Sequence, residues 1–95
     1  MTRTLVETPR FARALRKYTA RHRQRQECVA ETLLRMGADV FDPRLKTHGL
    51  SGDMAGHFAC SCGYDCRLVF KIVLDAKMKK ECILLMNVGT HDEVY

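Results

Sequence analysis

The stretch HFACSCGYDCRLVFKIVL, residues 57–74, decides the fold that the sequence predicts. Its first six residues alternate as strand residues do, and its last nine are dominated by branched apolar side chains. Gly63, Tyr64 and Asp65 between them have the composition of a turn. We therefore predict two antiparallel strands, at 57–62 and 66–74.

A third strand is expected to complete this meander. Residues 75–80 form a charged turn, and residues 81–88 are again apolar. Gly89 is then expected to end the strand. On the N-terminal side, residues 2–7 alternate loosely and predict one more short strand.

Two helices are predicted between the first strand and the meander. Thr8 followed by Pro9 is a helix start signal, and apolar residues follow at helical spacing: Phe11, Ala14, Leu15 and Tyr18. A second helix is expected over 27–36, with Gly37 as its stop and an apolar stripe of Cys28, Val29, Leu33 and Leu34. Residues 21–26 contain neither Gly nor Pro, so one long bent helix is the alternative. Residues 38–53 are expected to be an irregular connection.

This order of elements predicts a single domain over residues 1–95. Strand, helix, helix and three antiparallel strands make a small α+β sandwich, with both helices on one face of an antiparallel sheet. No apolar stretch approaches the roughly 18 residues that a membrane helix needs, so no membrane association is expected. The first residues also lack the apolar core of a secretory signal, which predicts a cytoplasmic protein.

The net charge of +5 is concentrated in the predicted helices. Between Arg10 and Arg25 there are seven Lys or Arg residues and no acidic residue. Such a surface attracts phosphate backbones or an acidic protein, although a simply solvated helix face is the alternative.

Three of the five cysteines are clustered as C-x-C-x3-C at Cys60, Cys62 and Cys66. Zinc ligands usually occur as two pairs with gaps of two to four residues, and this spacing does not match. Alternation places Cys60 and Cys62 on one sheet face, where thiols pack as small apolar groups. We expect core packing and no metal or other cofactor, with a metal or redox role as the alternative.

Chemically useful residues stand where predicted elements begin or end. They are His48 after the connection, Asp65 and Arg67 at the start of the second meander strand, and His91 beyond the third. Histidine can remove or supply a proton near neutral pH, and arginine matches the oxygens of a phosphate. Such a set suits cleavage of RNA, in which the 2′-hydroxyl attacks the neighbouring phosphorus without a metal.

Four segments together resemble a known family. They are LKTHGLSG (45–52), GHF (56–58), YDCRLVFK (64–71) and GTHDEVY (89–95). In this order and spacing the chain resembles the RelE/ParE superfamily of type II toxin–antitoxin toxins, and within it the YafQ-like mRNA interferases. The resemblance is specific over residues 45–95 and extends to the helical half only in pattern.

The resemblance implies a cytoplasmic toxin that enters the ribosomal A site and cuts mRNA by metal-free attack of the 2′-hydroxyl. It also implies a cognate antitoxin that wraps around the toxin, and a toxin–antitoxin complex that binds operator DNA. By position, His91 matches the family's general acid, His48 or Asp65 the base, and Arg67 the phosphate contact. Tyr95 matches an aromatic residue that stacks on a base. Lys71 falls in the same strand motif and is assigned to substrate binding with it.

One position departs from the YafQ pattern. Those toxins carry a catalytic histidine on the strand before the Asp turn, where this chain has Ser61; RelE has lysines on that strand, where this chain has Phe58 and Cys60. His57 could replace the histidine if no bulge separates it from Ser61, so both residues are placed in substrate binding. Two alternatives remain: a ParE-type inhibitor of DNA gyrase, and a catalytically weak toxin that serves mainly as a co-repressor.

Overall fold

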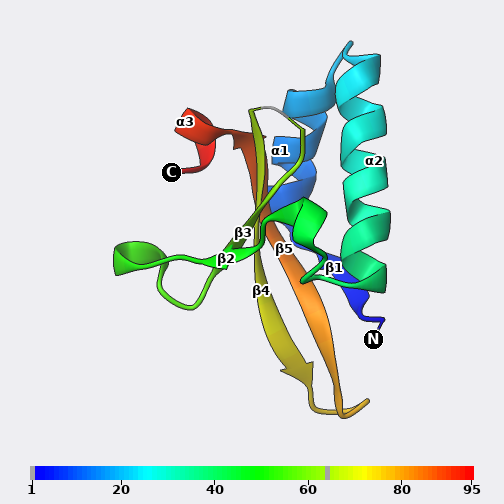
Figure 1. Cartoon of the computed structure of the whole chain (residues 1–95), viewed down its shortest axis with the longest axis vertical. Coiled ribbons are helices and arrows are strands. Elements are labelled where there is room, and N and C mark those ends of the chain that lie inside the picture. The colour runs from blue at the N-terminus through cyan, green and yellow to red at the C-terminus, as the bar shows by residue number, and fades with distance from the viewer. Residues whose placement is uncertain (1, 64) are drawn as a thin grey trace.

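A five-stranded mixed sheet forms the centre of the protein, in the order β1-β5-β4-β3-β2 (Figure 1). The computed structural model describes residues 2–63 and 65–95. The strands are β1 (Thr4–Glu7), β2 (His48–Gly49), β3 (Phe58–Ser61), β4 (Cys66–Asp75) and β5 (Lys80–Thr90). Strands β2 to β5 are antiparallel neighbours, as predicted for the meander, whereas β1 joins β5 in parallel.

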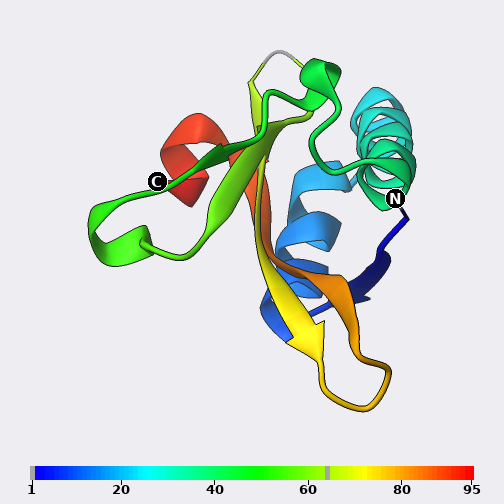
Figure 2. The same cartoon turned by 60° about the horizontal axis from the view of Figure 1, so that its bottom comes forward.

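The helices divide between the two faces of the sheet. Figures 1 and 2 show α1 (Pro9–Thr19) and α2 (Arg23–Ala38) on one face, and α3 (His91–Val94) on the other. Two short 3-10 helices, η1 (Pro43–Leu45) and η2 (Gly52–Met54), lie in the connection before β3. The α+β class and the placement of both long helices on one face are confirmed. Among the helices described, none combines the length and apolar character that crossing a membrane requires.

Thr8 fixes the start of α1 and its position on the sheet. Its hydroxyl accepts the N–H of Phe11 at 3.1 Å and donates to the carbonyl of Leu85 on β5 at 2.7 Å. The Thr8 N–H bonds the same carbonyl at 3.2 Å. The predicted start at Thr8 and Pro9 is therefore confirmed, and the N-cap residue also attaches the helix to β5.

The second helix differs from its prediction at both ends. It begins four residues early, at Arg23, and the chain breaks between the helices at Arg21, whose φ of 58° is left-handed. The alternative of one long bent helix is therefore wrong. Gly37 does not stop α2; the helix continues to Ala38, and the Gly37 carbonyl accepts the N–H of Arg3 at 2.9 Å.

Part of the predicted apolar stripe on α2 is also wrong. Val29 is buried and Leu33 packs against the core, but Cys28 is exposed and Leu34 is 78% exposed. Helical rotation carries both residues away from the sheet, because α2 packs on the core along only one narrow face.

The strand β2 and the helix α3 were absent from the prediction. β2 is only two residues long, and its strand character comes from pairing with β3 in the register His48 to Ala59. Gly89 does not end β5, which continues to Thr90 before α3 begins directly at His91. A Cβ on Gly89 would lie 3.0 Å from the carboxylate oxygen Oε1 of Glu93, so this glycine permits α3 to pack closely on β5.

The core lies between the two long helices and one face of the sheet. Phe11, Val29 and Met36 from the helices pack against strand residues such as Leu68 and Phe70. Cys60, Cys62 and Cys66 are buried in this cluster as free thiols, which confirms the prediction that they pack in the core.

The opposite face of the sheet carries a smaller buried patch. Ala59 and Val69 are fully or almost fully buried, and Val94 of α3 is 7% exposed, yet none of the three belongs to the main core. This second patch docks α3 onto β4 and leaves the rest of the face open. We call this side of the sheet the open face.

Removing the Thr8 hydroxyl tests the helix attachment. Thr8→Ala should lower the free energy of unfolding by about 1–2 kcal/mol, because one cap and one bond to the sheet are lost. Exposed Thr2, substituted by alanine as a control, should change it by less than about 0.5 kcal/mol. Urea unfolding measures both; equal effects of the two substitutions would contradict this account of Thr8.

Candidate active site on the open face

Arg67 stands at the centre of the open face. On β4 it is opposite Ser61 of β3 on one side and Gly89 of β5 on the other. It is half-buried, and its Nη1 donates to the carbonyl of Cys66 at 2.9 Å. Among residues 2–63 and 65–95 this is the one hydrogen bond of the Arg67 side chain, so its other guanidinium donors can serve a ligand such as a phosphate.

His91 and Tyr95 are held next to Arg67 by α3. The first turn of this helix is a capping box, in which Glu93 accepts the N–H of Thr90 at 2.9 Å. Those hydrogen bonds from Thr90 lower the pKa of Glu93. The rings of His91 and Tyr95 meet edge to face with centroids 4.7 Å apart, and Nδ1 of His91 is 3.7 Å from Asp92.

The charge of Arg67 influences the pKa of the Tyr95 phenol. Partial burial raises the pKa of the phenol, while the positive charge of Arg67 acts in the opposite direction. His91, Tyr95 and Arg67 thus form one cluster, which the sequence predicted from the boundary between β5 and the following residues.

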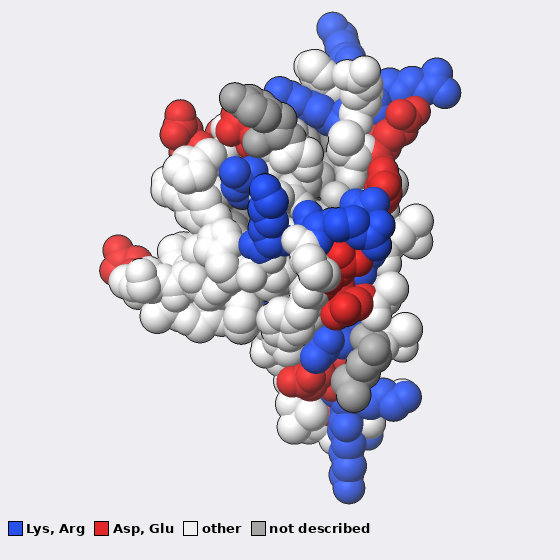
Figure 3. Space-filling view, in the orientation of Figure 1, with Lys and Arg blue, Asp and Glu red and all other residues white. Residues whose placement is uncertain are grey.

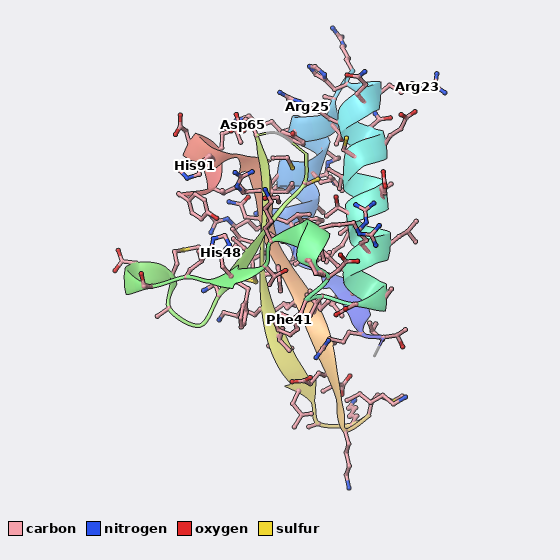
Figure 4. The ribbon with its side chains drawn as sticks, in the orientation of Figure 1. Arg23, Arg25, Phe41, His48, Asp65 and His91 are labelled. Carbon is pink, nitrogen blue, oxygen red and sulfur yellow. The ribbon has the colours of Figure 1, made fainter. Side chains whose placement is uncertain are left out.

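His48 lies on the far side of Arg67 from His91. β2 and β5 are separated by β3 and β4, which corresponds to about 14 Å at the usual spacing of strands. The ring is exposed, and its Nδ1 lies 3.0 Å from the carbonyl of Lys46. Because a carbonyl can only accept, Nδ1 carries the proton and Nε2 is left as the basic nitrogen. Figure 4 shows His48 and His91 on the same side of the sheet.

Asp65 precedes Arg67 by two residues, and Lys71 follows it by four. Asp65 is exposed in the turn that precedes β4, where Figure 4 labels it, and is not beside His48. It stands at the same end of the sheet as His91, because the last register pair of β4 and β5 joins Cys66 to Thr90. Lys71 is half-buried on β4, four residues or roughly 13 Å along the strand from Arg67.

His57 lies on the open face. β3 pairs with β4 without a register shift, so alternation places residues 57, 59 and 61 on the same side. The half-buried ring has its Nδ1 3.2 Å from the carbonyl of Met54. His57 does not occupy the position of Ser61, which lies four residues further along the chain at the end of β3.

A hollow of about 200 Å³ adjoins this cluster and includes residues that the sequence analysis did not single out. His57 and Val69 line it together with Met86, Asn87 and Val94. One signal was visible in the sequence: Asn87 is the single polar residue in the apolar run ILLMNV of β5. The hollow itself depends on how α3 folds back over the sheet, which no local pattern encodes.

The clustered cysteines lie on the other side of the sheet and take no part in this site. Burial raises the pKa of Cys60 to about 12, and a hydrogen bond with Cys62 together with burial raises that of Cys66. Cys60 and Cys66 are therefore thiols at neutral pH. Within residues 2–63 and 65–95, no three His, Cys, Asp or Glu side chains are grouped so as to hold a metal ion.

Positive charge is spread along the long axis of the molecule. Figure 3 shows Lys and Arg side chains at the end where α1 meets α2, across the middle of this view, and at the turn between β4 and β5. Part of the first group is engaged within the protein: Arg25 stacks 4.3 Å from the ring of Tyr18, and Arg23 lies 3.4 Å from Glu27. Arg10 and Lys17 of α1 instead line a cleft of about 230 Å³ beside Asn87.

Comparisons with solved structures find toxins of toxin–antitoxin systems. The Escherichia coli DinJ-YafQ complex matches with a TM-score of 0.76 at 14% identity, over 100% of this chain and 99% of the other. A YoeB/ParE toxin from Agrobacterium tumefaciens matches at 0.74 and 17%, covering 93% and 98%. A copper-bound mutant toxin from Helicobacter pylori matches at 0.75 and 21%, with both chains covered completely.

These likenesses show the fold. The chain has the architecture of RelE/ParE-superfamily toxins, YafQ among them, over its whole length, so the predicted RelE-like fold is confirmed. No family profile matches the chain, and no curated protein matches its sequence.

Thiol reactivity tests the separation of the cysteines from the site. At pH 8, exposed Cys28 should react with iodoacetamide within minutes, whereas Cys60 should react only when the protein unfolds, because its raised pKa and burial keep it a shielded thiol. Mass spectrometry of the labelled protein measures this, and Cys28→Ser should remove the fast phase. Rapid labelling of Cys60 in the folded protein would contradict the structure.

Proposed function

We propose that this chain is the toxin of a type II toxin–antitoxin system and acts as a ribosome-dependent mRNA endonuclease. One observation carries the proposal: on the open face, Arg67 lies between His48 on β2 and the His91–Tyr95 pair on α3. An arginine flanked by two imidazoles is what cleavage of a phosphodiester by its own 2′-hydroxyl requires. The likeness in fold to YafQ agrees with this function.

In the proposed reaction, the scissile phosphate binds over Arg67. Nε2 of His48 removes the proton of the 2′-hydroxyl, whose oxygen then attacks the phosphorus. Arg67 donates hydrogen bonds to the phosphate oxygens as negative charge develops on them. Protonated His91 gives its proton to the departing 5′-oxygen, and the products are a 2′,3′-cyclic phosphate and a 5′-hydroxyl.

The geometry favours His48 over Asp65 as the base. An acid and a base must act on opposite sides of the phosphorus. In the strand order, His48 on β2 lies to one side of β4, which carries Arg67, and His91 follows β5 on the other side. Asp65 instead stands at the same end of the sheet as His91. Ser61, directly opposite Arg67, would contribute a hydroxyl as a further donor to the phosphate.

Tyr95 and Lys71 are proposed to bind the RNA beside the cleavage site. Tyr95, 47% exposed and braced by the ring of His91, offers a face on which a base stacks. Lys71 lies on the same face of β4 and would meet the phosphate backbone further along the strand.

The proposed partners follow from charge and from the related complex. The basic end formed by α1 and α2 would bind ribosomal RNA at the A site of a cytoplasmic ribosome, with an affinity that falls as salt rises. YafQ was solved with DinJ, and we propose a cognate antitoxin for this chain that likewise covers it. Operator DNA would be bound by that toxin–antitoxin complex.

Replacing His91 tests the proposed function. Expression of the chain alone should arrest growth and cut translated mRNA, whereas His91→Ala should lose at least about 100-fold in cleavage rate because the leaving oxygen is no longer protonated. Thr2→Ala is the control, since Thr2 is exposed and lies outside both the candidate site and the basic end formed by α1 and α2, and this variant should remain toxic.

Mapping of mRNA ends in cells that express each variant measures this cleavage. Intact mRNA together with gyrase-linked DNA breaks would contradict the proposal and indicate that the chain inhibits DNA gyrase. Intact mRNA without growth arrest, in a chain that still binds its antitoxin, would indicate the co-repressor instead.

A further inference from the structure

The hollow near Arg67 is lined mostly by apolar side chains. They come from Val69, Met86, Met54 and Val94 of α3, and Arg10, His57 and Asn87 complete the lining. Met86 is the extra residue of a β-bulge: Val69 pairs with Asn87 while Phe70 pairs with Leu85, so the strand bends at this point. The hollow has a volume of about 200 Å³.

This hollow is next to the proposed cleavage site. Val69 is two residues from Arg67 on the same face of β4, roughly 7 Å along the strand. Val94 immediately precedes Tyr95 in α3. A nucleotide whose phosphate binds Arg67 therefore has this hollow within reach of a neighbouring base.

Two polar groups face a ligand in the hollow, one a donor and one an acceptor. The side-chain oxygen of Asn87 accepts the N–H of Val88 at 2.9 Å, which assigns the amide and leaves its two N–H donors for a ligand. Nδ1 of His57 donates to the carbonyl of Met54 at 3.2 Å, so Nε2 is the acceptor of the neutral ring.

Arg10 gives the hollow a positive rim. It lines the hollow and also the adjoining cleft between α1 and β5, and Asn87 does the same, so the two spaces meet at these residues. Lys17 and Glu93 also line the cleft but not the hollow. Arg10 therefore brings a positive charge to the lining of the hollow.

We propose that this hollow binds one base of the RNA substrate, the base beside the cleaved phosphate, and that Asn87 selects it through a hydrogen bond to an acceptor atom on the base edge. The inference rests on the proposed function and adds to it a residue that determines specificity. Apolar walls suit the faces of a base, and a donor–acceptor pair suits its polar edge. Single-stranded RNA presents both, because its bases are unstacked and splayed.

Methionine methyl groups report directly on occupancy of the hollow. In the His91→Ala variant labelled with [13C-methyl]methionine, single-stranded RNA oligonucleotides should shift the methyl signals of Met54 and Met86. Met36 in the core and Met78, 64% exposed in the turn between β4 and β5, serve as controls within the same chain and should not move. RNA that leaves Met54 and Met86 unshifted overturns the proposal, whether or not the wild type cuts mRNA.

Two substitutions of Asn87 test the selection of the base. Asn87→Asp keeps the oxygen that accepts the Val88 N–H but replaces the donors by an acceptor, and Asn87→Ala removes both. Each should change the ratio of bases found beside the cut by roughly 2- to 10-fold, as expected for one hydrogen bond. A general effect of the added charge would lower cleavage at all sites alike and leave that ratio unchanged.

The outcomes separate this inference from the proposed function. Shifts at Met54 and Met86 with an altered base ratio support both. Shifts at these residues in a chain whose wild type does not cut support the base pocket and remove the nuclease. Cleavage with an unchanged base ratio in both Asn87 variants overturns the role of Asn87.

Discussion

The alternation of side chains along β4 is the constraint on which the rest of the structure depends. Leu68, Phe70 and Ile72 point into the core beneath α1 and α2, so Arg67 and Lys71 must lie on the opposite face. β4 pairs along its length with β5 and at its start with β3, which fixes this division across three strands. A slip of one residue would bury the arginine and expose Phe70, so a single register defines both the core and the site.

The two faces have different roles because the two long helices, α1 and α2, cover only one of them. Thr8 attaches α1 to β5 on the covered side, and the apolar residues and buried thiols of the protein gather there. On the open face, Ala59, Val69 and Val94 form a small buried patch against which α3 packs. Polar and ionisable side chains can therefore stand close together without disturbing the packing that stabilises the fold.

Alternation and capping in the sequence predicted most of this arrangement. The meander, the start of α1 and the burial of Cys60, Cys62 and Cys66 all follow from local patterns that the structure keeps. Two of the predictions that failed depend on contacts with another element of the fold. Gly37 and Gly89 look like stops, yet each serves close approach of another segment: Arg3 at Gly37 and Glu93 at Gly89.

The candidate site was likewise predictable only in part. His48, Arg67 and His91 could be identified from their positions at element boundaries and from the family resemblance. The order of the strands places His48 and His91 on opposite sides of Arg67. The hollow that Asn87 lines depends on α3 folding back over β4. Neither is encoded in the spacing of residues along the chain, because both arise from the tertiary fold.

The chemistry of the cut ends tests the central claim most directly. Translated mRNA incubated with ribosomes and this protein should yield fragments with a 2′,3′-cyclic phosphate on one side of the cut and a 5′-hydroxyl on the other. Those ends follow from attack by the 2′-hydroxyl between two imidazoles. Fragments that carry a 3′-hydroxyl and a 5′-phosphate would instead mean that water is the nucleophile, and would contradict the roles assigned to His48 and His91.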